Sequence, residues 1–246
     1  MAKFITFIAL LLFSNVLTAQ TCVLAIKTKD EIVLGADSKA GVFNGKPILI
    51  CKIKHTKNIV FSLSGYIFKG MPDTIIRILN NSLEPLNNKV DNLLKTLRPI
   101  ITNTCENMRN NDRKNYDMIF KDSLVCKIIL CTFENNLPIM EVLIFQILNP
   151  TTQPVFITPF LNENFVLTSE RPYDYRIIGD ADCLNELGQD SAEKVLQHKD
   201  KFNTILHFIT RQGEITPNHV SAPINIIRIK PDNTIEWICR DPTCNQ

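Results

Sequence analysis

The stretch TCVLAIKTKDEIVLGADSKA, residues 21–40, contains two short runs of strand-favouring residues on either side of a polar turn. The runs are residues 22–26 and 32–36, and every residue between them is polar or charged. Apolar runs of this length with polar boundaries predict two strands joined as a hairpin. Residues 48–54 and 58–64 repeat the pattern with a tight polar link. The fold is therefore predicted to begin with two strand–turn–strand units.

The period of the apolar residues changes further along the chain. Between residues 90 and 108 they recur at spacings of three and four, which predicts an amphipathic helix with its stripe against the core. A shorter helix is expected at residues 72–80, because proline is favoured in a first helical turn. The later predicted elements are strands at residues 124–133, 140–147, 175–178, 224–229 and 234–239, a helix at residues 183–187, and a helix from Ser191 to about Thr210.

This order of elements predicts the class of fold. No change in composition divides the chain after residue 20, and no internal repeat is evident. Four strands, two helices, further strands, two helices and two final strands are typical of a layered α+β protein, in which helix pairs pack on antiparallel sheets. We expect one domain spanning residues 21–246.

Composition excludes several classes of protein. Hydrophobic residues make up 45% of the chain and charged residues 21%, which is typical of a globular domain. The net charge of only +2 argues against a dedicated nucleic-acid-binding protein. No glycine-rich nucleotide motif and no H-E-x-x-H motif occurs. The four histidines are scattered and no C-x-x-C pair exists, so we expect neither a metal site nor a cofactor.

Residues 1–20 have the layout of a secretory signal peptide. Lys3 provides a short positive region, residues 4–13 are apolar apart from Thr6, and small and polar residues follow. The apolar run is too short to span a bilayer. The sequence therefore predicts an exported protein, secreted or periplasmic, that has no membrane segment after cleavage. A small residue before the cut favours cleavage after Ala19, whereas cleavage after Gln20 leaves Thr21 as the first residue.

Export also affects the interpretation of the eight cysteines. Outside the cytosol an even number of cysteines permits disulfides, but the sequence does not choose among the pairings. Cys239 and Cys244 bracket four residues near the end of the chain and could close a small loop.

With Thr21 as first residue, the chain opens with a threonine on a strand, continues through a hairpin and reaches Ala36-Asp-Ser-Lys-Ala40. Asp37 follows Thr21 by sixteen residues. This arrangement resembles the start of mature proteasome β-type subunits, which are N-terminal nucleophile hydrolases. The resemblance implies a four-layer αββα sandwich, with two antiparallel sheets flanked by helix pairs. Because proteasome subunits stack into rings, it also implies that a homo-oligomer can form.

The same resemblance nominates further site residues. The family carries a catalytic lysine in a lysine–apolar–basic stretch, which residues 51–55 match with Lys52, and Lys54 is the alternative. A small-residue segment ending in glycine follows in the family, and residues 62–65 match it. The backbone N–H of Gly65 would then form the oxyanion hole. The implied site consists of Thr21, Asp37 and Lys52 as catalytic residues and Gly65 as the oxyanion-hole residue. Asp37 and Lys52 are expected on adjacent strands of one sheet, within salt-bridge reach of each other and of Thr21.

Two departures from the family pattern lie later in the chain. Family members carry a serine after a glycine where this chain has Gly179 followed by Asp180. They also carry an Arg-Asp pair followed by Ser-Gly where residues 211–217 read RQGEITP. Glu214 and Thr216 are both candidates to replace the supporting polar residues of the family.

The chemistry of these residue types supports the assignment. A threonine hydroxyl is a weak nucleophile that needs a base. An N-terminal residue carries its own base, an α-amine with a pKa of about 7.7–8.0. A nearby lysine would lower that pKa further, an aspartate would hold the lysine charged, and a backbone N–H would stabilise the oxyanion.

Three functions remain open at the level of sequence. The first is an exported threonine protease or other amidohydrolase, with Thr21 as nucleophile and a peptide or other amide as substrate. The second is a non-catalytic proteasome-like domain used for binding or assembly. The third is an unrelated disulfide-stabilised binding protein, in which Asp37 and Lys52 would lie apart and exposed.

Overall fold

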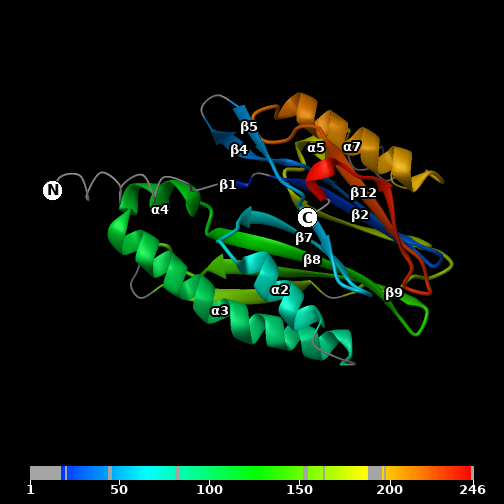
Figure 1. Ribbon diagram of the computed structural model, residues 1–246, viewed down its shortest axis with the longest axis horizontal. Helices are drawn as coiled ribbons and strands as arrows, with labels where there is room; N and C mark the ends of the chain where they lie inside the picture. Colours follow the sequence, from blue (N-terminus) through cyan, green and yellow to red (C-terminus); the bar gives the residue numbers. More distant parts are fainter. Residues whose placement is uncertain are drawn as a thin grey trace.

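The computed structural model describes residues 18–19, 21–43, 46–80, 84–151, 155–162, 164–187, 196 and 198–244. Within these residues the protein is a mixed α/β fold with three antiparallel sheets and five α-helices (Figure 1). The predicted signal peptide lies outside the described residues, except for the backbone of residues 18–19. None of the helices in the described part of the chain is both long and apolar enough to cross a membrane.

The largest sheet has six strands in the order β1-β7-β8-β9-β10, with β6 also paired to β7. Its strands are β1 (Thr18–Ala19), β6 (Ile53–His55), β7 (Val60–Tyr66), β8 (Leu124–Glu134), β9 (Leu137–Ile147) and β10 (Ile157–Asn162). Both β6 and β1 lie along the edge of β7 that faces away from β8. β6 pairs with the first half of β7, and β1 pairs with its last two residues.

The second sheet has five strands in the order β11-β2-β3-β12-β13. Its strands are β2 (Cys22–Thr28), β3 (Ile32–Asp37), β11 (Tyr173–Gly179), β12 (Ile224–Ile229) and β13 (Ile235–Cys239). The hairpin predicted in residues 21–40 is confirmed as the antiparallel pair β2–β3. A third, two-stranded sheet pairs β4 (Lys39–Phe43) with β5 (Lys46–Leu49).

The second predicted hairpin is only partly correct. The expected single strand at residues 48–54 is divided, because residues 48–49 end β5 whereas β6 begins at Ile53. The residues between the two strands make other contacts. The Ile50 N–H donates to the Ser38 carbonyl, Cys51 forms a disulfide, and Lys52 turns its side chain to Asp37. These contacts take the segment out of the β-ladder.

The helices are α2 (Met71–Asn80), α3 (Leu86–Asn111), α4 (Arg113–Ile119), α5 (Asp182–Leu187) and α7 (Lys201–Ile215). The apolar stripe predicted on residues 90–108 is confirmed, since its central residues are buried in one cluster with Phe61 of β7 and Ile128 of β8. The predicted helix start at Ser191 lies outside the described residues, and within them α7 begins at Lys201, where Asp200 caps the helix by accepting the Asn203 N–H.

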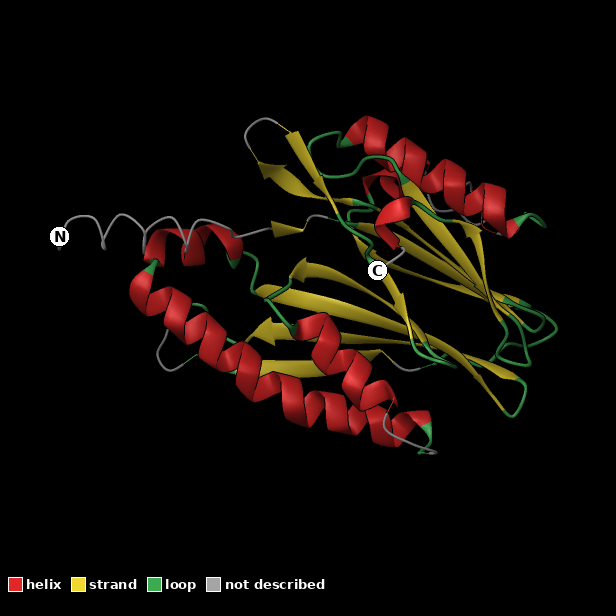
Figure 2. Ribbon diagram, in the orientation of Figure 1, coloured by secondary structure: helices red, strands yellow, loops and turns green. Residues whose placement is uncertain are grey.

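Both faces of strand β2 are buried, and this places the start of the strand deep in the molecule. Val23 and Ala25 belong to a cluster that includes Val60 and other residues of the six-stranded sheet. Leu24, on the opposite face, packs in a cluster with Phe208 of α7. Figure 2 shows α7 over the five-stranded sheet and helices α2 and α3 over the six-stranded sheet. A strand buried on both faces explains why residues 22–26 are continuously apolar.

Candidate active site

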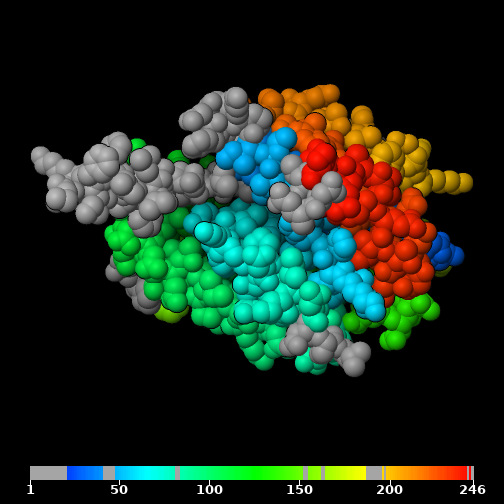
Figure 3. Space-filling model, in the orientation of Figure 1, coloured from blue at the N-terminus to red at the C-terminus, as the bar shows by residue number. Residues whose placement is uncertain are grey.

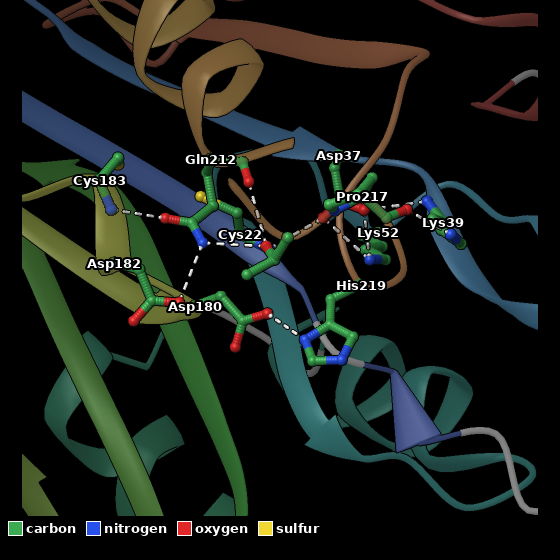
Figure 4. Close-up of polar contacts among 11 residues, drawn as sticks. Cys22, Asp37, Lys39, Lys52, Asp180, Asp182, Cys183, Gln212, Pro217 and His219 are labelled. Carbon is green, nitrogen blue, oxygen red and sulfur yellow. Dashed lines mark hydrogen bonds and ion pairs between the residues drawn. The ribbon is translucent and has the colours of Figure 1, made fainter. Parts of the chain in front are cut away.

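The side chains of Asp37 and Lys52 form a buried ion pair. Lys52 Nζ lies 2.9 Å from each carboxylate oxygen of Asp37, and both side chains are 0% exposed (Figure 4). The predicted contact between these two residues is therefore present. The prediction that they lie on adjacent strands of one sheet is wrong. Asp37 ends β3 in the five-stranded sheet, whereas Lys52 immediately precedes β6 of the six-stranded sheet.

Backbone groups complete the surroundings of the Asp37 carboxylate. The N–H of Cys22, the residue after Thr21, donates to Oδ1 at 2.9 Å, and the N–H of Lys39 donates to Oδ2 at 3.0 Å. Asp37 thus accepts bonds from an ammonium and two amides, as a buried carboxylate requires. Burial raises the pKa of Asp37, against the opposing effect of Lys52 and the two amides. Burial lowers the pKa of the Lys52 ammonium, and the Asp37 carboxylate opposes that change.

Thr21 lies immediately before β2 and is completely buried. Its carbonyl oxygen accepts a hydrogen bond of 2.8 Å from the N–H of Asp180, just beyond the end of β11. Gly179 makes this close approach possible. It has φ +90°, and a Cβ atom at this position would lie 1.6 Å from the Thr21 carbonyl oxygen. The backbone of Thr21 is therefore held between the ion pair and the end of β11.

Gly65 lies on β7, in the other large sheet, and also has a positive φ, +90°. It pairs with Cys126 of β8 on one edge and with Ala19 of β1 on the other. Gly65 is linked to the other predicted site residues through Ala19. Ala19 pairs with Gly65 and precedes Thr21 by two residues in the sequence. Lys54, the alternative to Lys52, lies within β6 and is partly exposed, away from the ion pair.

Asp180, which replaces the serine of the family pattern, has a partner at this site that the sequence did not indicate, His219. The Asp180 carboxylate lies 3.2 Å from Nδ1 of His219, and the two side chains are 24% and 37% exposed (Figure 4). Burial raises the pKa of the Asp180 carboxyl, while His219 and Lys52 oppose the increase. Asp180 is therefore an acidic group close enough to the ion pair to be affected by its charge. His219 carries no sequence motif, and only the fold brings it to Asp180.

Glu214 and Thr216, the two candidate supporting residues, lie in different surroundings, and Thr216 contacts a buried glutamine. Gln212 is 0% exposed, and its Nε2 donates to the hydroxyl of Thr216 at 3.0 Å. Its Oε1 accepts the N–H of Cys183 at 2.9 Å. Glu214 instead pairs with Arg211 on the surface. Residues 212 and 216 lie one helical turn apart, and this spacing was the sequence signal that could have identified the pair.

The cysteines pair differently from the loop that the sequence suggested. The disulfide joins Cys51 to Cys244, while Cys239 is an exposed free thiol. The short 3₁₀ turn Pro242–Cys244 after β13 brings Cys244 to the segment that precedes Lys52. The loop Cys239–Cys244 is therefore a wrong prediction, and the bond observed fixes the segment that carries the catalytic lysine candidate.

Within the described residues, no group of three or more His, Cys, Asp or Glu side chains is arranged to hold a metal ion. The scan of this chain against protein-family models finds no match, and the search of the curated proteins finds no significant relative.

Proposed function

We propose that this protein is an exported threonine-type N-terminal nucleophile amidohydrolase, which hydrolyses a peptide or another amide after residues 1–20 have been removed. The observation that carries the proposal is the buried pair of Asp37 and Lys52 bonded to the backbone of Cys22, next to Thr21. Burying two charged groups costs free energy of desolvation, and ionisable groups perturbed by burial and by a charge partner occur preferentially at functional sites.

We also propose that the fold is the four-layer αββα sandwich of this family. Three apolar clusters support it. One lies between helices α2–α4 and the six-stranded sheet, the second contains residues of both large sheets, and the third lies between the five-stranded sheet and helices α5 and α7. Clusters with this membership are expected of two sheets that pack face to face with helices on their outer sides.

The catalytic roles follow from the chemistry of each group. The free α-amine of Thr21 takes the proton of its own hydroxyl, and the Thr21 oxygen forms a bond with the carbonyl carbon of the substrate. Lys52 favours the neutral amine and stabilises the developing negative charge, while Asp37 keeps Lys52 charged and in place. The C–N bond then breaks, and the departing amine takes the proton. Water hydrolyses the resulting ester and restores the hydroxyl.

Substrate binding is proposed at the edge of β7. The backbone of residues 18–19 pairs with Gly65 and Tyr66 at this edge, beyond the end of β6. An extended peptide could pair there in the same way, by adding a strand to the sheet. Its carbonyl would then lie near the N–H of Gly65, the group to which we assign the oxyanion. The proposal thus gives Gly65 a role in binding as well as in catalysis.

A non-catalytic domain used for binding or assembly is the second candidate function. The observation that favours it is the pair Gln212 and Asp180, which stand where the proteasome family has an aspartate and a serine. Gln212 is a neutral amide whose oxygen and nitrogen are bonded within the fold, to Cys183 and Thr216. It cannot orient the α-amine as a carboxylate does.

The N-terminal residue of the mature protein is the first test. Mass spectrometry of the exported protein should find Thr21 at the N-terminus, and finding Gln20 or Cys22 there would contradict the mechanism. The second test uses a peptide boronate, which forms a covalent bond with an active hydroxyl. We expect the adduct on Thr21 in the mature protein and in Thr21→Ser, and no adduct in Thr21→Ala or in the protein that retains Gln20. A correctly processed protein that gives no adduct would favour the non-catalytic function.

A further inference from the structure

A pocket of about 660 Å³ is lined by residues that adjoin the candidate active site in the chain. Cys51 and Ile53, the two neighbours of Lys52 in the chain, both line it, and so does Ala40, three residues after Asp37. Further lining residues come from the turn before α2 and from the C-terminal segment with Trp237 and Arg240. In Figure 3 the cyan residues around α2 and the red C-terminal residues lie near each other on this face of the molecule. We call this cavity the basic pocket.

The charged residues of the basic pocket are mainly cationic. Lys54 of β6, Lys69 before α2 and Arg240 after β13 line it, against the single carboxylate of Asp73. Each cation comes from a different segment of the chain, so the fold gathers them. Among the residues that the structure describes, none of the three forms an ion pair, in contrast to the buried lysine of the active site.

Part of this positive charge is held in place before any ligand binds. The guanidinium of Arg240 lies 5.2 Å from the centre of the Trp237 ring and donates to the Cys244 carbonyl at 2.7 Å. Cys244 is in turn bonded to Cys51, so the arginine is attached to a covalently fixed segment. The first turn of α2 also lines the pocket, and its peptide dipoles add partial positive charge. A site with such preformed charge is suited to an anion.

Apart from His55, the remaining lining is mainly apolar, and this narrows the chemistry of the ligand. Ile50, Ile53, Ile67, Phe68 and Ile76 line the pocket together with Trp237. A small inorganic anion would leave these side chains without contacts. A glutamyl side chain, by contrast, has methylene groups to place against them and a carboxylate for the cations.

We propose that the basic pocket binds the carboxylate of an acidic side chain in a peptide, next to the bond that Thr21 attacks. The position of the bond rests on the proposed function, whereas the binding of the carboxylate does not. Arg240 and Lys54 contact the carboxylate, and the apolar lining contacts the stem of the side chain. The protein therefore prefers peptides with glutamate or aspartate over their neutral analogues.

The binding test uses Trp237, the only tryptophan in the chain, as a fluorescent reporter that does not depend on catalysis. The protein is the mature Thr21→Ala variant, and the probe is acetyl-Ala-Ala-Glu-amide, with the Gln analogue as its neutral match. Acetyl-Ala-Ala-Ala with a free C-terminus tests whether a terminal carboxylate is bound instead. We expect the Glu peptide to bind roughly tenfold more tightly than the other two, as expected for a charge-assisted hydrogen bond.

Variants link this preference to the pocket. Arg240→Gln and Lys54→Gln should each remove most of the tenfold preference, while the matched control Lys121→Gln, an exposed lysine outside the pocket, should keep it. Equal affinity for the Glu and Gln peptides, a preference for the terminal carboxylate, or a preference that survives both variants would overturn the proposal.

Hydrolysis provides a second, separate readout. In the mature protein with Thr21 intact, Lys54→Glu should abolish the preference of cleavage for acidic side chains, because two carboxylates then balance Lys69 and Arg240. If Trp237 fluorescence shows selective binding of the Glu peptide but no peptide is cleaved, the proposed carboxylate site is supported and the proposed function is contradicted. Cleavage that depends on Thr21 but is indifferent to charge would leave the proposed function intact and overturn the pocket.

Discussion

Lys52 Nζ meets both carboxylate oxygens of Asp37 at 2.9 Å across the interface between the two large sheets. Asp37 belongs to the five-stranded sheet through β3, while Lys52 is joined directly to β6 of the other sheet. The pair therefore connects the sheets as well as the two segments that approach Thr21. We expect this ion pair to help to fix the position of one sheet relative to the other. If the sheets moved apart, each ion would lose its partner while still buried away from water.

Removing one member of the pair should be strongly destabilising. We expect Asp37→Asn to lower the free energy of unfolding by about 3–5 kcal/mol, because the Lys52 ammonium is left buried without its counter-ion. Adding Lys52→Met to this variant should restore part of the loss. Urea unfolding of the three proteins measures both effects.

The exposed pair of Arg113 and Asp117 is the matched control for that experiment. Both side chains are about half exposed, so water and salt screen their interaction. Asp117→Asn should leave the urea midpoint nearly unchanged. If Asp37→Asn were equally harmless, the buried pair would not have the structural role that we give it.

Gly179 should tolerate no side chain. In Gly179→Ala the new Cβ would overlap the carbonyl oxygen of Thr21, so the start of β2 must move. Gly70→Ala provides the comparison, since Gly70 also has a positive φ, +82°, but has nothing within 4 Å of the added atom. We expect Gly70→Ala to lower the free energy of unfolding by only about 1–2 kcal/mol. Gly179→Ala should cost clearly more, and equal losses for the two variants would contradict the close approach.

The hairpin and the ion pair illustrate what local sequence can predict. The alternation of apolar runs and polar turns in residues 21–40 specifies β2 and β3, and the resemblance of the motifs was sufficient to associate Asp37 with Lys52. The sheet to which Lys52 is attached was not predictable, because residues 48–54 read as one apolar strand. This segment is divided by the hydrogen bond from Ile50 to Ser38 and by the disulfide from Cys51 to Cys244. No sequence pattern indicates either contact.

The polar residues around Asp180 illustrate the opposite case. His219 pairs with Asp180 and Gln212 donates to Asp182, although each pair is separated by at least thirty residues in the sequence. Their meeting depends on how α7 and the turn after it pack against the end of β11, and this packing is decided by the whole apolar cluster of that side. Single-residue propensities contain no information of this kind.

Thiol labelling should count the disulfide and the buried cysteines. In the folded protein an alkylating reagent should modify Cys239 alone, because the other five free cysteines are buried. Burial also raises the pKa of Cys105 and Cys131 to about 12, which further suppresses their reactive thiolates. Mass spectrometry should find one adduct under native conditions, six in denaturant and eight after reduction. Eight adducts without reduction would mean that Cys51 and Cys244 are not bonded.

Titration of Asp180 should depend on His219. The pKa of this carboxyl is raised by burial, and the charged groups that face it act in both directions: His219 and Lys52 lower the pKa, whereas Asp182 raises it. His219→Ala removes the partner that most lowers the pKa of Asp180, so this pKa should rise further, and a higher pH is then needed to ionise the carboxyl. Carbon-13 NMR of the Asp180 carboxyl in the Thr21→Ala protein measures this shift without requiring activity.

The same shift has a consequence for catalysis under the proposed function. If the Asp180 carboxylate helps to hold the α-amine of Thr21, activity falls as the pH drops through the pKa of Asp180. The acid side of the pH–rate profile should then contain two steps, one from the Thr21 α-amine, which must be neutral to act as the base, and one from Asp180. The Asp180 step should move to higher pH in His219→Ala and disappear in Asp180→Asn, while His207→Ala, on the exposed side of α7, leaves both steps in place. Steps that both stay fixed in His219→Ala, although NMR shows that the Asp180 pKa has moved, would remove Asp180 from the reaction.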